Sequence, residues 1–136
     1  RALCAREGAT LYAAMLAAMQ VLLSKYAGTK RFLLGSPVAN RQQAETEELI
    51  GLFANPQFLP VDLTGVSTFR ELLQRVGTEM LETLPHQELP FERLVEELEL
   101  DRGRQRFSLP VYFVLQKAFM QPQQLAGLEI VPRRSV

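Results

Sequence analysis

The chain has 136 residues, of which 47% are hydrophobic and 22% are charged. These values are typical of one folded domain and argue against a disordered chain. Fifteen basic side chains balance fifteen acidic ones, and the chain has no long lysine or arginine run that would indicate nucleic-acid binding. No apolar run approaches the roughly 18 residues that span a bilayer, so we expect neither a membrane segment nor a signal peptide.

Cysteine and histidine each occur once. Cys4 cannot form an intramolecular disulfide, which favours a reducing compartment, and we expect the protein to be cytoplasmic. His86 alone cannot make a histidine-rich zinc site and Cys4 is far from it in the sequence, so we predict no metal site. A thiol nucleophile with a histidine base is the alternative, but no positioned base accompanies Cys4, and we interpret it as an ordinary core or surface thiol.

The first part of the chain predicts a helix followed by a strand. Thr10 is a suitable N-cap and Gly28 a suitable end for a helix apolar enough to be buried on most faces. Its larger apolar residues recur at helical spacing and predict a buried stripe: Leu11, Met15, Met19, Leu22 and Tyr26. Residues 31–38, with a dense apolar centre at residues 32–34, predict a strand.

A short helix and a second strand are predicted next. Three apolar residues have the spacing of a helix over residues 45–53: Leu49, Ile50 and Phe53. Residues 57–63 predict a strand, and Pro60 within it indicates an edge position or a bulge.

Two further helices are marked by their boundaries. Thr68 and Glu71 have the spacing of a capping box, and Pro85 ends the helix that follows. The buried face of this helix should hold Phe69, Leu72, Leu73, Val76, Met80 and Leu84. Pro90 lies near the first turn of the next helix, whose buried face should hold Phe91, Leu94, Val95 and Leu98.

The last part of the chain predicts two more strands. Residues 109–116 are β-branched or aromatic at most positions of their centre, and residues 128–131 follow a loop rich in glutamine and proline. Helices and strands thus alternate, with connections long enough for crossovers, so we predict an α/β two-layer sandwich. Its sheet should be parallel or mixed, contain residues 32–38 and 112–115, and be covered by the helix over residues 11–26.

Several polar residues stand where chemistry or local structure needs them. Gly35-Ser36-Pro37 ends a strand and exposes Ser36 there; without a Gly-x-Ser-x-Gly motif, a tight turn is favoured over a nucleophile. Asn40 and Arg41 fit a turn residue and a surface cation. Asn55 precedes a proline, and its amide is suited to bond a backbone carbonyl or a ligand carbonyl.

His86 lies in the connector between two predicted helices. As a general base it would need a cleft and an orienting partner, and the connector guarantees neither. We therefore predict a structural histidine, packed near Phe91 and hydrogen-bonded to backbone.

Five segments in this order resemble the C-terminal half of a condensation domain from a nonribosomal peptide synthetase. Residues 22–28 and 36–41 are similar to a Leu-Leu-x-x-Tyr-x-Gly helix end and to a Thr-Pro-Val-Ala-Asn-Arg stretch. Residues 50–56 and 86–92 resemble the fifth and sixth family motifs, with departures at Ala54, Pro56 and Glu88. Residues 101–116 correspond to a degraded seventh motif. The catalytic histidine motif of the family is absent.

The resemblance implies a lobe similar to chloramphenicol acetyltransferase, with residues 1–136 as a C-terminal lobe trimmed at both ends. In that family, two lobes enclose a tunnel in which a carrier-bound amine attacks a carrier-bound thioester. No cofactor would bind directly, because phosphopantetheine is carried by the partner carrier proteins. Partners would be the missing N-terminal lobe and the upstream and downstream peptidyl carrier proteins.

The resemblance also assigns site residues and leaves two alternatives open. Substrate binding would fall to Gly35, Ser36, Pro37 and Asn55, and local structure to Asn40, Arg41, His86, Gln87, Pro90, Phe91 and Glu92. Ser36 and Asn55 should line one tunnel face. We expect the chain alone to be inactive. A related acyltransferase that makes esters or loads fatty acyl groups is one alternative, and a degenerate, non-catalytic domain that recruits partner proteins is the other.

Overall fold

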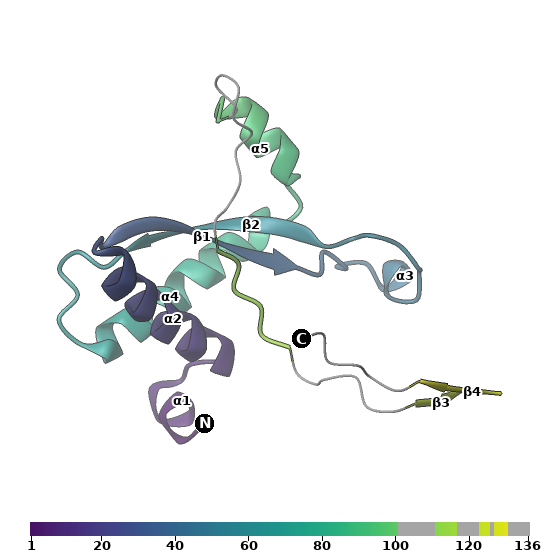
Figure 1. Ribbon diagram of the computed structural model, residues 1–136, viewed down its shortest axis with the longest axis horizontal. Helices are drawn as coiled ribbons and strands as arrows, with labels where there is room; N and C mark the ends of the chain where they lie inside the picture. The colour runs from purple at the N-terminus through teal and green to yellow at the C-terminus, as the bar shows by residue number, and fades with distance from the viewer. Residues whose placement is uncertain (101–110, 117–122, 126, 131–136) are drawn as a thin grey trace.

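The computed structural model describes residues 1–100, 111–116, 123–125 and 127–130. Figure 1 shows two helices packed on one side of a two-stranded sheet, with a third helix beyond the sheet. The described elements are α1 (Ala2–Glu7), α2 (Leu11–Ala27), β1 (Arg31–Val38), α3 (Ala44–Glu47), β2 (Asn55–Asp62), α4 (Phe69–Thr83), η1 (Leu84–His86), α5 (Phe91–Glu97), β3 (Gln123–Leu125) and β4 (Leu128–Ile130). The predicted α/β class is confirmed. None of these helices is long and apolar enough to cross a membrane.

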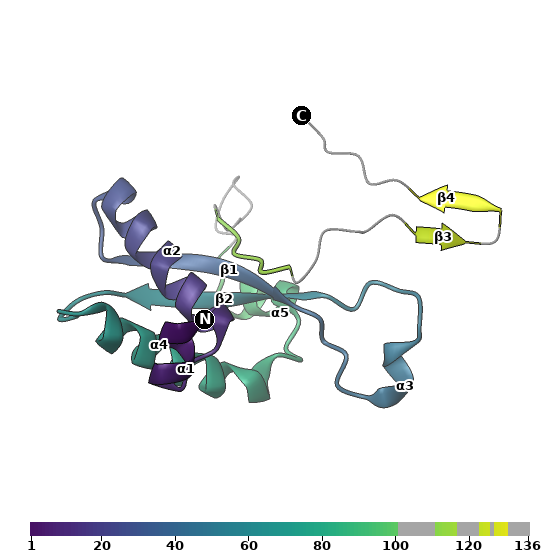
Figure 2. The ribbon, with the colours of Figure 1, turned by 90° about the horizontal axis from the view of Figure 1, so that it is seen from below.

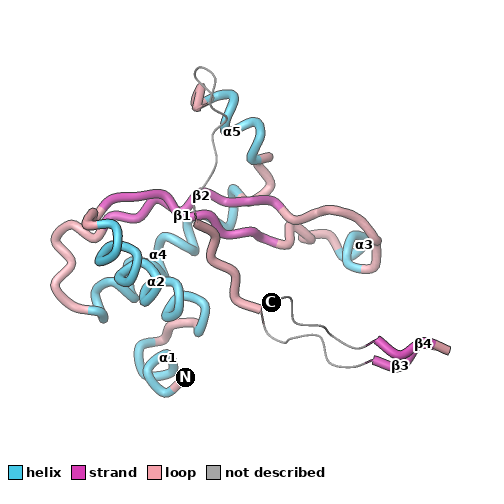
Figure 3. The backbone as a smooth tube through the Cα atoms, viewed as in Figure 1, coloured by secondary structure: helices cyan, strands magenta, loops and turns pink. Residues whose placement is uncertain are grey.

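The central sheet pairs β1 with β2 in antiparallel register, from Arg31 opposite Asp62 to Val38 opposite Asn55. Figure 3 shows the two strands side by side along their length. Because side chains alternate between the faces of a strand, this register places the side chains of Leu34, Leu59 and Val61 on one face. The core forms on that face, where these residues meet buried side chains of α2 and α4: Ala13, Leu16, Ala17, Leu72, Leu73 and Val76.

The α2 helix begins and ends as predicted but buries a different face. Thr10 caps it by accepting a hydrogen bond from the Ala13 N–H (3.1 Å), and Gly28 ends it in the left-handed conformation. The buried residues are Ala13, Leu16, Ala17 and Gln20, whereas Met15, Leu22 and Tyr26 of the predicted stripe are 47%, 51% and 86% exposed. The prediction was wrong because α2 is apolar on several faces, and its small alanines allow the closer approach to the sheet.

Two of the predicted helices differ from expectation: one is shorter, and the other buries fewer residues. The helix expected over residues 45–53 is confined to α3, because Leu49 and Ile50 find no layer to pack on and are 54% and 105% exposed. The face predicted for α5 is buried only at Val95, and Leu98 is 58% exposed. By contrast, β1 spans the predicted residues, and α4 carries the predicted capping box between Thr68 and Glu71.

The strand predicted over residues 109–116 is reduced to one parallel bridge between Gly35 and Tyr112; residues 109–110 lie outside the described part of the chain. The Gly35 N–H donates to the Val111 carbonyl (2.9 Å), and the Phe113 N–H donates to the Gly35 carbonyl (2.8 Å). The next donor of a parallel ladder would be the N–H of residue 37, which proline lacks. The central sheet therefore has two antiparallel strands, and the predicted strand over residues 109–116 adds one parallel bridge to it.

The outer edge of β2 bears two prolines. The backbone N–H and carbonyl of Gly35 point away from β2, toward residues 111 and 113. In an antiparallel pair, the opposite residue Phe58 then points its backbone groups away from β1, and so do Pro56 and Pro60, two residues to either side. Neither proline has an N–H to offer, which makes this edge a poor template for another strand. The edge position predicted from Pro60 is confirmed within the described residues, where β2 pairs with β1 alone. The remaining strands, β3 and β4, form a hairpin of their own, of which only β4 was predicted.

The capping box gives a first test of the fold. Thr68→Ala removes the hydroxyl that accepts from the Glu71 N–H (3.2 Å), and should lower the free energy of unfolding by about 1 kcal/mol. Urea unfolding followed by circular dichroism measures this loss. Ser67→Ala is the matched control, because Ser67 contributes its backbone N–H to Glu71. Equal effects of the two changes would contradict the cap.

Candidate functional site

A buried amide on β2 holds the connector between α4 and α5, which we define as residues 84–90. The Asn55 amide nitrogen donates to the carbonyls of Gln87 (2.9 Å) and Leu89 (2.7 Å). Its amide oxygen accepts from the N–H of Phe91 (3.2 Å), the first residue of α5. Asn55 is 7% exposed, and the alternative between backbone and ligand is resolved in favour of backbone. Asn55 therefore forms three of the bonds that hold the connector and the start of α5 to the sheet.

Two neighbours of Asn55 on β2 strengthen this attachment. Gln57 donates from its amide to the Gln87 carbonyl (3.2 Å). The ring of Phe58 packs against that of Phe91, with centroids 4.9 Å apart. Pro90 stands at the N-cap of α5 without a side-chain bond, and Glu92 is exposed in its first turn. Sequence reasoning missed Gln57, although its alternation with Asn55 along one strand was a usable signal.

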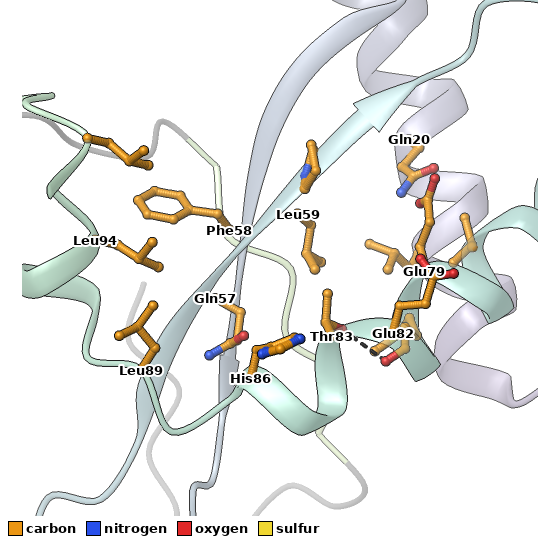
Figure 4. Close-up of a pocket in the computed structure, with 15 residues that line it drawn as sticks. Gln20, Gln57, Phe58, Leu59, Glu79, Glu82, Thr83, His86, Leu89 and Leu94 are labelled. Carbon is orange, nitrogen blue, oxygen red and sulfur yellow. Dashed lines mark hydrogen bonds between the residues drawn. The ribbon is translucent and has the colours of Figure 1, made fainter.

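His86 does not have the structural role that we predicted. Its side chain is exposed and makes no hydrogen bond within the described part of the chain, although its carbonyl accepts from the Leu89 N–H (3.2 Å). Figure 4 shows the ring among residues that line a pocket, near Gln57. The prediction failed because Asn55 and Gln57 supply the bonds that we assigned to His86.

Ser36 is buried and bonded at two points. It is 4% exposed, shares a short hydrogen bond with the Tyr12 hydroxyl, and donates to the Phe113 carbonyl (2.9 Å). Tyr12 also meets Phe113 edge-on, with ring centroids 5.2 Å apart. Burial raises the pKa of the Tyr12 hydroxyl, and the bond with Ser36 opposes part of that rise. The Ser36 hydroxyl thus supplies the donor that Pro37 lacks in the parallel ladder.

The predicted substrate-binding residues are brought together, but as structural groups. The register places Ser36, Asn55 and Gln57 on the same face of the sheet. That face is covered, and the side chains of Ser36 and Asn55 form their hydrogen bonds within the chain. We therefore correct the direct substrate contact predicted for Ser36 and Asn55 to a structural role. The backbone groups of Gly35 are bonded in the bridge with Tyr112, and Pro37 is exposed.

Arg41 organises the loop between the two central strands, residues 44–53. Its guanidinium donates to the carbonyls of Thr46, Glu47 (3.4 Å) and Leu49 (2.9 Å). It also lies over the Phe53 ring, 4.2 Å from the centroid. Asn40 before it adopts a left-handed φ of 51°, which asparagine tolerates better than most residues. The loop is braced from within, although its apolar residues face outward.

The described residues offer little for metal or thiol chemistry. They contain no group of three or more histidine, cysteine, aspartate or glutamate side chains that would hold a metal ion. Cys4 is buried at 8% exposure in α1.

The arrangement matches one known family, and the chain belongs to it. The model described as Condensation domain matches residues 1–133. One of the proteins that make up the linear gramicidin synthase of Brevibacillus parabrevis is 47% identical over 135 residues, which cover 98% of this chain and 2% of that protein. Chondramide synthase from Chondromyces crocatus is 41% identical over 127 residues, which cover 93% of this chain and 3% of that protein. The chain is thus a small part of the curated relatives it matches.

Solved structures agree on the fold. SgcC5 from Streptomyces globisporus is 32% identical with a TM-score of 0.66, covering 71% of this chain and 21% of its own. The X-domain from teicoplanin biosynthesis is 30% identical with a TM-score of 0.69, covering 81% and 24%. The complex of that X-domain with OxyB matches at 26% identity and a TM-score of 0.66, covering 80% and 27%. These likenesses confirm the predicted lobe of the chloramphenicol acetyltransferase type.

Asn55 and His86 make opposite predictions for stability. Asn55→Ala leaves the Leu89 carbonyl and the Phe91 N–H without their partner, while the Gln87 carbonyl keeps its bond from Gln57, and should lower the free energy of unfolding by about 2 kcal/mol. His86→Ala should change it by less than about 0.5 kcal/mol, because the ring is exposed. Urea unfolding of the two variants measures the difference. A larger loss for His86→Ala would restore the structural histidine.

The brace of Arg41 predicts a change in protease sensitivity. Glu45, Glu47 and Glu48 lie in the braced loop, where a glutamate-specific protease would cut. Arg41→Lys keeps the charge but loses the planar fork, so cleavage there should become faster. Arg31→Lys is the control, because Arg31 makes an exposed ion pair with Asp62 at the far end of the sheet. Mass spectrometry of the fragments gives the rates, and equal cleavage in both variants would rule out the brace.

Proposed function

We propose that this chain is part of a condensation domain that joins carrier-bound aminoacyl or peptidyl thioesters through an amide bond. The family match over residues 1–133 carries the proposal. In the parent protein, the amine of one substrate attacks the thioester carbonyl of the other, and the thiol of the donor carrier leaves. The partners would be upstream and downstream carrier proteins, in a cytoplasmic synthetase.

The role of this chain in that reaction is to form one wall of the tunnel between the two lobes. Residues 1–136 would form part of the C-terminal lobe, and the histidine motif would belong to the other lobe. Phosphopantetheine would enter as the arm of a carrier protein. Ser36 and Asn55 do not fit as its binding groups, because their hydrogen bonds are already used within the chain. Their part is to hold the wall in shape.

Exposed apolar residues support a second lobe as partner. Ile50 and Leu52 are 105% and 95% exposed in the braced loop. An apolar surface held rigidly toward solvent is typical of an interface. The chain also spans only 21% and 24% of two of the solved chains it matches, SgcC5 and the X-domain. We therefore expect the other lobe to cover this loop.

The assay of the complete enzyme tests the proposed function. With loaded donor and acceptor carriers, the complete enzyme should yield an amide product detected by mass spectrometry, and the 136-residue chain alone should yield none. His86→Ala in the complete enzyme should keep turnover within about twofold of the parent, because no step uses that ring. Turnover by the chain alone that His86→Ala abolishes would make His86 catalytic.

A recruitment domain is the second candidate, and the likeness to the X-domain favours it. That domain has been solved as a complex with OxyB. A complete protein that yields no amide product but binds a separate enzyme in a stable complex would replace the first proposal with this one.

A further inference from the structure

A half-open groove of about 450 Å³ lies between the sheet edge, α4 and α5. Its walls are mainly apolar and come from four elements: Leu16 on α2, Leu59 on β2, Val76 and Met80 on α4, and Leu94 on α5, with Leu98 at the C-cap of α5. Figure 4 shows these elements around the groove, and Figure 2 shows α5 behind the sheet from below. The volume is that of a typical small-molecule site. We call it the α4–α5 groove.

A buried amide lines one end of the α4–α5 groove. Gln20 is 3% exposed, yet its side chain forms no hydrogen bond with any described residue. No buried side-chain nitrogen or oxygen of the described residues lacks a partner, so the unbonded amide atoms of Gln20 reach the surface of the groove. The buried amide of Asn55 differs, because both its nitrogen and its oxygen are hydrogen-bonded within the chain. Gln20 therefore has both a donor and an acceptor to offer to a ligand.

A carboxylate lies beside this amide. Figure 4 shows Glu79 of α4 next to Gln20. Glu79 is half-buried and has no ion pair among the described residues, and burial raises the pKa of its carboxyl. The field of Arg75 opposes that rise, but the Arg75 guanidinium donates to the Asp62 carbonyl (2.7 Å) instead. Glu82 and Asp62 raise the pKa of Glu79 further, so two carboxylates and one arginine act on this side chain.

We propose that the α4–α5 groove binds a small apolar molecule that ends in a protonated amine. The ammonium group would donate to the Glu79 carboxylate and to the Gln20 carbonyl oxygen, which satisfies both groups at once. The apolar body would lie against Met80, Leu94 and Leu98. A carboxylate ligand would be repelled by Glu79 and Glu82, and a neutral one would bury the Glu79 charge without a partner. The proposal does not rest on the proposed function.

Three probes that share one apolar chain separate charge from hydrophobicity. n-Octylamine, n-octanol and n-octanoate are titrated into the complete protein with ¹³C-labelled methionine methyls. Met80 lines the groove and also two neighbouring cavities, so the Glu79 variants below are needed to assign its shift to the groove. Met15 lies on the exposed face of α2 and reports unspecific binding. Octylamine should change the chemical shift of the Met80 methyl group and bind about tenfold more tightly than octanol, and octanoate should bind most weakly.

Variants of the two polar groups complete the test. Glu79→Gln should remove the preference for octylamine over octanol, and Glu79→Asp should retain it. Gln20→Leu should lower the affinity for octylamine more than the affinity for octanol. Glu47→Gln in α3 is the control, and thermal melting verifies that each variant is folded. Equal affinity for all three probes, an equal shift at Met15, or an unchanged preference in Glu79→Gln would overturn the proposal. No response at Met80 would also overturn it, because another part of the protein then fills the groove.

Discussion

The antiparallel register of β1 and β2 is the constraint on which the described structure depends. One set of pairs places Leu34, Leu59 and Val61 under α2 and α4. The same register puts Ser36, Asn55 and Gln57 on that face, at the end where the connector returns. A shift of β2 by one residue would turn the side chains of Asn55, Gln57, Leu59 and Val61 to the other face. Core and connector would then lose their contacts together.

Polar groups on this face replace bonds that the backbone cannot make. Pro37 interrupts the parallel ladder, and the neighbouring Ser36 hydroxyl donates to the Phe113 carbonyl instead. The connector has no strand to pair with, and Asn55 takes up its carbonyls. In both cases a short side chain forms a part-buried bond with a backbone carbonyl that has no strand partner there. These residues resemble site residues because they are polar at strand ends, but their partners are internal.

Elements with a local cause were predictable from the sequence. The caps of α2 and α4 depend on residues three positions apart, and both agree with the structure. The buried face of α2 was not predictable, because its sequence is apolar on several sides and the choice among them depends on the sheet. The roles of Asn55 and His86 were exchanged for a similar reason. The bonds of Asn55 reach 32 to 36 residues along the chain, and local pattern says nothing about such contacts.

The bond between Ser36 and Phe113 also bears on the order in which the chain folds. It joins residues 77 positions apart, whereas the contacts of α4 with its cap span three or four. The entropy of closing a loop grows with its length, so contacts between distant residues form readily only after the intervening segment has become compact. The segment at residues 111–113 should therefore dock onto a preformed hairpin and helix pair. Until it does, the outward backbone groups of Gly35 remain open to water, and a ribosome-bound chain would pass through that state.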